Sequence, residues 1–444
     1  MSGTHFFAGG IHLPPFDEPV LSRAIEKLPP PDRVVIPLLH HNGAAAHPIV
    51  ARGDRVVEGQ IIGEADSPEA AFIHASISGT VASVASFPHA SGANVLSVTI
   101  NRNGDEAAHA MSTKPWRELA PEEIIGIIEN AGIIGSHGDL IHQTLARTAG
   151  KEVDTVIING VECEPGLAAA RRLLIEKTEE VLCGALITRK VCGAHRLVLA
   201  IGKEKRSQAA AAVTRLCAND AFKEIEFAQV AARYPAGDPA LVIKAATGRT
   251  IPPHGAPIDA RCVVIDVAAA LAIRNALCDG LPATRRLITV SGPCITKPAN
   301  LLVPVGTPVR LLLAHCQADM SRATRLIAGG SMSGRCLHDP DVPCIKTWSA
   351  LQLTNAVFPD VRMRPCINCG HCVKVCPRHL VPSMIARYAE KGDYRAAAEW
   401  NAGDCLECGC CAWVCPSKIN LLHFLQIARS MAARATAAET GARS

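Results

Sequence analysis

The chain has 444 residues, of which 48% are hydrophobic and 19% are charged, and its net charge is +4. At about 100–200 residues per domain, the length predicts roughly two to four domains, and this composition excludes wholesale disorder. The small net charge excludes a strongly basic nucleic-acid surface, and 4% aromatic residues exclude a stacking platform for single strands. We therefore expect no nucleic acid among its partners.

Neither a membrane span nor an export signal is visible in the sequence. A spanning helix needs about 18 or more consecutive apolar residues, and the longest candidate, around 262–273, is interrupted by Asp266. The N-terminal residues lack a basic start followed by an apolar stretch. We therefore expect a cytoplasmic chain that does not cross a membrane.

The first 110 residues are predicted to form a β module. Short β-branched runs between residues 31 and 84 are separated by glycine-containing turns. The pattern resembles a lipoyl- or biotinyl-type barrel-sandwich hybrid, which carries its cofactor on a lysine at a hairpin tip. Because no lysine lies between Ile49 and Val84, we expect a structural or docking module instead of a covalent carrier.

Residues 115–282 alternate β-rich apolar runs with helix-like stretches. A helix is predicted over Pro121–Asn130, and Asp238 and Gly248 have the positions of cap residues at the two ends of another. Strands are predicted over 153–158, 196–201 and 262–267. Alternating strands and helices indicate a mainly parallel α/β sheet. The next segment, 283–335, is predicted to be a small α+β unit that ends in a glycine-rich loop.

Two identical cysteine runs, C-x2-C-x2-C-x3-C-P, lie near the C-terminus of a chain with nineteen cysteines. Their members are Cys366, Cys369, Cys372, Cys376, Cys405, Cys408, Cys411 and Cys415. In two-cluster ferredoxins this spacing binds [4Fe–4S] clusters, and the fourth cysteine of each run ligates the other cluster. Zinc prefers four ligands in two pairs, which the repeated four-cysteine runs with their trailing prolines do not resemble.

The crossed pattern assigns the eight thiolates to two clusters. The first set is Cys366, Cys369, Cys372 and Cys415, and the second is Cys376, Cys405, Cys408 and Cys411. The intervening segment is helix-like, so residues 355–430 are predicted to be an all-helical ferredoxin domain. Residues 431–444 are predicted to be a flexible tail. Cys410 lies off the spacing and is left out of both sets.

With these segments in order, the chain resembles the RnfC family, the C subunits of Rnf (Rsx) electron-transport complexes, over residues of about 5 to 430. The matching stretches are GGIHLPP (9–15), GDRVVEGQIIG (53–63), INGVECEPGLAAARRLL (158–174), IKAATGRTIPPHG (243–255), IAGGSMSG (327–334) and the two cysteine runs. The resemblance implies a multidomain α+β fold. Its parts are an N-terminal β barrel-sandwich hybrid (1–110), an α/β domain like the complex I flavoprotein (115–282), a small β-grasp unit (283–335) and the all-helical double [4Fe–4S] ferredoxin domain (355–430).

The same resemblance implies a function. The chain is expected to be a peripheral subunit of an ion-translocating oxidoreductase complex, on the cytoplasmic side of the inner (plasma) membrane. Such a protein moves electrons between NADH or FMN and membrane partners through two [4Fe–4S] clusters. The implied partners are the membrane subunits of the complex, with NADH and ferredoxin-type carriers as electron donors or acceptors.

The resemblance also implies a flavin and NADH site, with Gly135, Gly138, Asn159, Glu162 and Glu164 as candidate residues. Here the chain departs from the family, which has G-x-G-G-x-x-F-P-T followed by a lysine. Residues 135–143 read GSHGDLIHQ, and the carboxylate of Asp139 is expected to face the flavin phosphate. Three interpretations follow: an NADH- and FMN-dependent oxidoreductase component, a relay module without flavin, and an oxidoreductase like cobalamin reductase.

Overall fold

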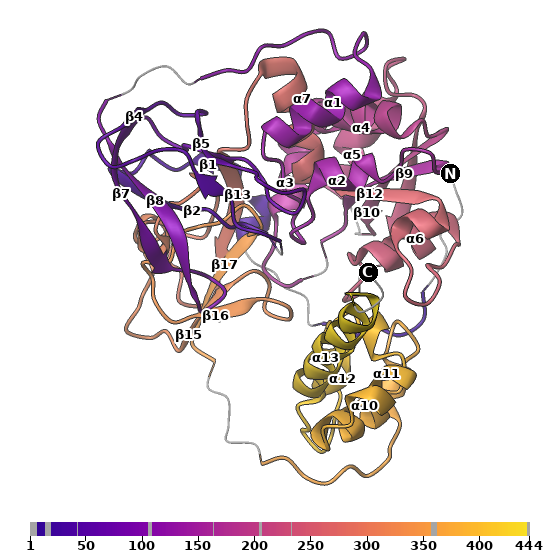
Figure 1. Ribbon diagram of the computed structural model, residues 1–444. Helices are drawn as coiled ribbons and strands as arrows, with labels where there is room; N and C mark the ends of the chain where they lie inside the picture. The colour runs from indigo at the N-terminus through magenta and orange to yellow at the C-terminus, as the bar shows by residue number, and fades with distance from the viewer. Residues whose placement is uncertain are drawn as a thin grey trace.

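The computed structural model describes residues 7–13, 19–41, 43–104, 109–162, 164–203, 207–231, 233–356 and 362–441, with side chains described as far as 432. A β module, an α/β domain with a parallel sheet, and a separate mixed sheet form the larger body (Figure 1). A helical domain near the C-terminus forms a separate lobe beneath it (Figure 1). The predicted multidomain α+β fold is therefore confirmed.

The N-terminal module consists of two antiparallel sheets that enclose a small apolar core. The first contains, in spatial order, β2 (Arg33–Pro37), β8 (Asn94–Arg102), β7 (Gly79–Pro88) and β4 (Arg55–Val56). The second contains β3 (His47–Pro48), β5 (Ile61–Glu64) and β6 (Ile73–His74). Val34, Ile36, Val98 and Ile100 alternate inward along β2 and β8 and are buried, as the period of a strand requires.

The α/β domain contains a four-stranded parallel sheet with helices on both faces. The strands, in spatial order, are β11 (Ile225–Val230), β10 (Arg196–Gly202), β9 (Thr155–Gly160) and β12 (Cys262–Asp266). The helices are α1 (Pro121–Asn130), α2 (Ile141–Ala146), α3 (Ala169–Glu176), α4 (Thr178–Cys192), α5 (Gln208–Cys217), α6 (Pro239–Thr247) and α7 (Val267–Asp279), with the 3-10 turn η2 (Pro257–Ala260). β9 is buried at every position, which fits the apolar run Val156–Ile158 at its centre.

The predicted caps of α6 are present. The Asp238 carboxylate accepts the Ala240 N–H at 2.9 Å, and Gly248 ends the helix at a φ of 76°. Asp266 caps α7 in the same way by accepting the Ala269 N–H at 2.9 Å. These caps fix the starts of α6 and α7 at the carboxyl edge of the parallel sheet, where α/β folds place ligands.

A six-stranded mixed sheet lies between the β module and the α/β domain. Its strands, in spatial order, are β1 (Ile25–Lys27), β14 (Ala299–Pro304), β13 (Arg285–Ser291), β17 (Ala350–Thr354), β15 (Arg325–Ala328) and β16 (Arg335–Leu337), and α8 (Val309–His315) packs on it. The sheet extends beyond the predicted 283–335, because β1 and β17 come from outside that range. Asn300 explains why β1 joins: its buried Nδ2 donates to the carbonyls of Val20 and Arg23, both at 2.9 Å, beside the 3-10 turn η1 (Pro19–Ser22).

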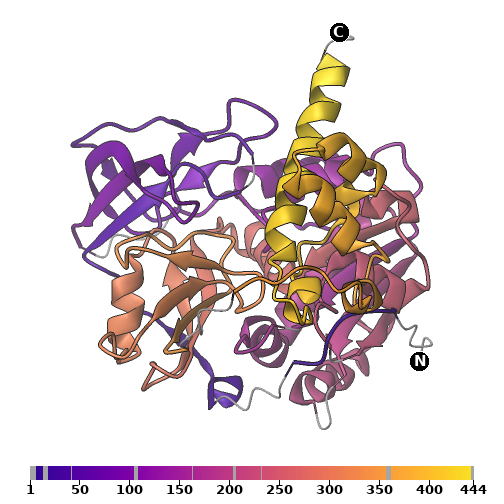
Figure 2. The same ribbon diagram turned by 90° about the horizontal axis from the view of Figure 1, so that it is seen from below.

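The C-terminal domain consists of helices and loops, with no strand among its described residues, as predicted for an all-helical domain. It contains α9 (His371–Lys374), α10 (Pro382–Glu390), α11 (Tyr394–Glu399), η3 (Ala402–Asp404), α12 (Cys410–Trp413) and α13 (Leu421–Gly441). α13 continues beyond residue 430, where the domain was predicted to end, as far as Gly441, and it projects from the molecule (Figure 2). The alanines of this segment favour helix, and Leu421 and Leu425 anchor its first turns in the core of the domain. None of the helices in the described ranges has both the length and the apolar character needed to cross a bilayer.

Lys346 lies where the β module, the α/β domain and the mixed sheet meet. Its Nζ donates to the Gly132 carbonyl at 2.8 Å, and its own backbone N–H donates to His40 Nδ1 at 3.4 Å. Burial lowers the pKa of Lys346 to about 7. Burial and the nearby Lys346 charge lower the pKa of His74 to about 3.

This buried lysine predicts a pH dependence of stability. Between pH 7 and the unfolded lysine pKa of about 10.4, the unfolded chain binds more protons at this position than the folded chain. The stability should therefore rise with pH across this window, by at most about 1.4 kcal/mol per pH unit for one proton. Thermal unfolding of the wild type and of Lys346→Met at several pH values tests this, and the variant should lack the rise. Equal slopes in the two proteins would contradict the assignment.

Candidate functional site

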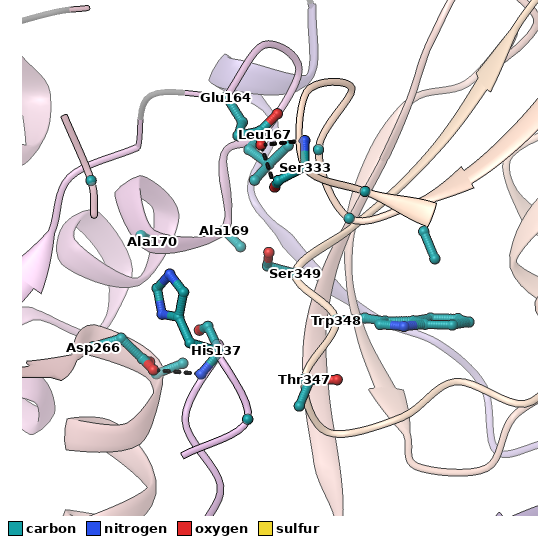
Figure 3. Close-up of a pocket in the computed structure, with 18 of the residues that line it drawn as sticks. His137, Glu164, Leu167, Ala169, Ala170, Asp266, Ser333, Thr347, Trp348 and Ser349 are labelled. Carbon is teal, nitrogen blue, oxygen red and sulfur yellow. Dashed lines mark hydrogen bonds between the residues drawn. The ribbon is translucent and has the colours of Figure 1, made fainter. Parts of the chain in front are cut away.

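A cavity of about 710 Å³ opens where the three units of the larger body meet, at the carboxyl ends of β9 and β12. This volume lies within the range of small-molecule and cofactor sites. Figure 3 shows His137 and Asp266 on one side of it and Thr347, Trp348 and Ser349 on the other. The glycine-rich loop at 328–334 closes one end.

The loop that follows α1 uses its backbone N–H groups within the protein. Gly135 donates to the Asp139 carbonyl at 2.9 Å, and Gly138 donates to the Gly135 carbonyl at 3.0 Å. The Ser136 N–H donates to Asp266 Oδ2 at 2.8 Å. A carboxylate of this chain therefore takes the place that an anionic ligand would take on the Ser136 amide, and backbone carbonyls occupy the Gly135 and Gly138 amides.

This arrangement corrects the expectation for Asp139. Its side chain is exposed and is not among the residues that line the cavity, so it does not bring negative charge to a ligand there. The negative charge comes instead from Asp266, at the start of α7. The buried guanidinium of Arg286 lies next to it and donates from Nη2 to Ser136 Oγ and from Nε to the Trp348 carbonyl, each at 2.8 Å.

The acidic loop after β9 is held by its own hydrogen bonds. Asn159 Nδ2 donates to the Gly237 carbonyl at 2.9 Å, and its Oδ1 accepts the Val161 N–H at 3.1 Å. The Glu162 carboxylate accepts the Ala170 N–H at 2.7 Å, at the start of α3, where the helix dipole favours negative charge.

Glu164 joins this loop to the glycine-rich loop of the mixed sheet. Its carboxylate accepts the N–H groups of Met332 at 2.9 Å and Ser333 at 3.0 Å, and it also accepts the Ser333 hydroxyl (Figure 3). A Cβ at Gly330 would lie 2.1 Å from a Glu164 oxygen, so only glycine permits this approach. Among the candidate residues, Gly138, Asn159, Glu162 and Glu164 line the cavity, and Gly135 lies just outside it.

Several lining residues were not predicted from the sequence. Arg286 stands in an apolar strand, where a buried charge is itself a signal of a polar site. The adjacent His40 and His41 and the more distant His89 come from the β module, and all three line the cavity. Neither their spacing nor their local sequence indicates that they meet loops of the α/β domain, which lie far away along the chain.

The eight cysteines of the two runs lie around two smaller cavities of the helical domain. Cys366, Cys369, Cys372 and Cys415 line one of them, and Cys376, Cys405, Cys408 and Cys411 line the other. These are the two crossed sets, and Cys410 also lines the second cavity. The four thiols of each set fit the ligand set of one [4Fe–4S] cluster.

The backbone of the two runs repeats. Asn368 and Glu407 both have a φ of 53°, and Gly370 and Gly409 both have a φ of 73°. These left-handed residues turn the first three cysteines of each run toward one cavity. The Leu380 N–H lies 3.4 Å from Cys376 Sγ, and the Glu407 N–H lies 3.4 Å from Cys405 Sγ, as donors that stabilise thiolate sulfur.

The two cysteine cavities differ in what they adjoin: one borders the large cavity and the other borders the surface. Cys408 and Leu406 line both the second of them and the large cavity, so the two share a wall. In the first set, Cys366 and Cys369 are exposed. The second set therefore adjoins the large cavity, whereas the first set reaches the surface.

The N-terminal segment holds this arrangement together. The Gly10 N–H donates to the Val375 carbonyl at 2.8 Å, and Ile11 pairs with Tyr234 through hydrogen bonds of 2.8 and 3.0 Å. Residues 7–13 therefore join the ferredoxin domain to the α/β domain, and Figure 2 shows them running between the two in indigo. Cys410, which lies off the cluster spacing, is buried in this contact beside Ile11 and Tyr234.

Comparisons with known proteins agree with this architecture. The RnfC barrel sandwich hybrid domain matches residues 5–105, the Nuo51 FMN-binding domain matches 128–275, and a 4Fe-4S dicluster domain matches 365–419. The chain is 38% identical to the C subunit of the ion-translocating oxidoreductase complex of Rhodobacter capsulatus, covering 88% of this chain and 76% of that protein.

Two further relatives have related names. The chain is 34% identical to the C subunit of the proton-translocating ferredoxin:NAD(+) oxidoreductase complex of Clostridium ljungdahlii, covering 88% of this chain and 86% of that one. It is 35% identical to the C subunit of the Na(+)-translocating ferredoxin:NAD(+) oxidoreductase complex of Acetobacterium woodii, covering 95% and 96%. These names agree with the resemblance to the RnfC family rather than with the cobalamin-reductase alternative. The chain therefore belongs to the RnfC family, the C subunits of Rnf-type ion-translocating oxidoreductase complexes.

Proposed function

We propose that this chain is the electron-transfer component that connects NADH and FMN in the large cavity to the membrane partners of an Rnf-type complex. The observation that carries the proposal is the wall shared by the large cavity and the second cysteine set, at Leu406 and Cys408. Electrons leaving the large cavity would reach the second cluster first. The first cluster, beside the exposed Cys366 and Cys369, would then meet the partner.

The residues of the chain have distinct tasks in this scheme. The eight thiolates hold two clusters, which supply single-electron storage, and the backbone N–H groups near Cys376 and Cys405 tune the potential of the second cluster. The chemistry that FMN supplies when bound is hydride exchange with NADH and release of single electrons. Glu164 and Asn159 keep the walls of the cavity in place through backbone hydrogen bonds.

A relay module without flavin is the second candidate, and one observation favours it. The Ser136 N–H is bonded to Asp266, and the amides of Gly135 and Gly138 are bonded within their own loop, so these three do not face a phosphate. In this alternative a soluble ferredoxin-type carrier would reduce the clusters directly. The two candidates share the clusters and differ in whether the large cavity holds flavin.

The position in the cell follows from the proposed role. We propose that the chain lies on the cytoplasmic side of the inner membrane, where NADH is available, and that it binds membrane subunits of the complex. The exposed basic residues of the first run, His371 and Lys374, are candidates for contact with an acidic partner, whereas Arg378 is paired with Asp404. Chemical cross-linking of the assembled complex would identify that partner.

The crossed ligand sets predict which cysteine variants resemble one another. In Cys366→Ser and Cys415→Ser the first cluster should be lost, so both should show the same remaining resonance after reduction by dithionite. Cys376→Ser and Cys405→Ser should share the other resonance. The wild type should contain about eight irons per chain, and each variant roughly half as many. Electron paramagnetic resonance and iron analysis measure both.

Cys336→Ser is the control for these variants, because Cys336 is exposed and lies outside both runs. It should retain both resonances and all the iron. The crossed assignment would be contradicted if Cys415→Ser resembled Cys405→Ser instead of Cys366→Ser.

The flavin part of the proposal has its own test. Purified protein with reconstituted clusters should retain yellow flavin, and NADH should bleach the cluster absorption. The absorption spectrum before and after NADH measures both. Protein that is free of flavin, binds none when it is added and does not react with NADH would support the relay module instead.

A further inference from the structure

A hydrogen bond closes each of the two crossed cysteine sets, at equivalent positions of the two runs. In the first set, Ser417 lies two residues after Cys415, and Pro365 lies directly before Cys366. The Ser417 hydroxyl donates to the Pro365 carbonyl at 3.0 Å. This closure joins two uncharged groups of the ferredoxin domain.

The second set is closed at the same two positions by an ion pair. Arg378 lies two residues after Cys376, and Asp404 lies directly before Cys405. Arg378 Nη2 is 3.4 Å from Asp404 Oδ1, and the two side chains are only 14% and 10% exposed. Burying two charges costs free energy that the uncharged closure of the first set avoids. The ion pair therefore indicates a task beyond closing the set.

Asp404 has a further partner, which belongs to the α/β domain. The backbone N–H of His254 donates to Asp404 Oδ1 at 2.9 Å. His254 has a φ of 56°, a left-handed conformation that is uncommon for residues other than glycine. The neighbouring Gly403 lies so close to this loop that a Cβ on it would be 3.4 Å from His254 Nδ1. The carboxylate of Asp404 thus ties the second set to the loop between α6 and η2.

The other members of this contact lead to the large cavity. Burial raises the pKa of Asp238, which lines that cavity, and the charge of Arg378 lies near enough to act in the opposite direction. On the Cys376 side, the N-terminal segment adds the hydrogen bond from the Gly10 N–H to the Val375 carbonyl at 2.8 Å. Both chain segments of the second set are therefore held at the wall of the large cavity.

We propose that Asp404 positions the second cluster against the wall of the large cavity. Its carboxylate accepts hydrogen bonds from the guanidinium that follows Cys376 and from an amide of the α/β domain, and it directly precedes Cys405. Leu406, which lines both cavities, is two residues away. The inference rests on the proposed function, because it assumes that electrons pass from the large cavity to the second cluster. Electron transfer slows steeply with distance, so loss of this anchor should slow that step.

The test uses the full chain with reconstituted clusters and flavin. Asp404→Ala removes the acceptor of both partners, whereas Asp404→Asn keeps an oxygen for the His254 amide and loses the charge that faces Arg378. Asp393→Ala is the matched control, because Asp393 is an exposed helix cap of the same domain. Ser417→Ala removes the closure of the first set instead.

Hydrogen–deuterium exchange measures the anchor without any need for flavin. In Asp404→Ala the amide of His254 should exchange about tenfold or more faster, since it loses a hydrogen bond to a charged acceptor. The rate in Asp404→Asn should lie between that of Asp404→Ala and that of the wild type. Asp393→Ala and Ser417→Ala should keep the wild-type rate.

Rapid freezing after mixing with NADH measures the positioning. In Asp404→Ala the flavin should be reduced as fast as in the wild type, whereas the resonance of the second cluster should appear severalfold later. A residue that only stabilised the fold would not separate these two steps. Ser417→Ala should leave both steps unchanged, and iron analysis should find about eight irons per chain in every variant.

The proposal is overturned if Asp404→Ala keeps the wild-type exchange at His254, or if its second cluster is reduced as fast as that of the wild type. Should Asp404→Ala lose iron, Asp404→Asn decides by the same two measurements. Wild-type protein in which NADH reduces neither flavin nor cluster would instead contradict the NADH and FMN part of the proposed function. The exchange comparison would then still decide whether Asp404 anchors the second set.

Discussion

Electron transfer through this chain depends on the contact between the ferredoxin domain and the α/β domain. The loop with Leu406 and Cys408 forms part of the wall of the large cavity, so the second cysteine set lies next to that cavity. The N-terminal segment fixes this contact from the other side. A Cβ at Gly9 would lie 2.8 Å from the carbonyl group of Cys376, which explains why a glycine with a φ of 76° stands there. The segment thus contacts a cluster-ligand residue directly.

The features that could be predicted from the sequence are those encoded locally. Each cysteine run determines its own loop, and the family of two-cluster ferredoxins supplies the crossed pairing. The parallel sheet follows from apolar runs that alternate with helices, and Asp238 and Gly248 mark the ends of α6 because caps act within one turn. β1 could not be predicted, since so short a strand has no usable period and its partner β14 lies far away along the chain.

The candidate site was only partly predictable, because its residues come from segments that lie far apart along the chain. The sequence identified the loops around Gly138, Asn159 and Glu164, but it attributed the negative charge to Asp139, which is exposed. The carboxylate on the loop belongs to Asp266, which reaches Ser136 only because α7 starts at the same sheet edge. His40 was missed because the β module meets the α/β domain only in three dimensions. Local pattern carries no information about such convergence.

The central claim is the order of electron flow, from the large cavity to the second cluster and then to the first. Rapid mixing of NADH with the flavin-loaded protein, followed by freezing and electron paramagnetic resonance, tests it most directly. The resonance that is retained in Cys366→Ser belongs to the second cluster and should appear before the resonance that is retained in Cys405→Ser. Appearance of the first-cluster resonance ahead of the second would contradict the account.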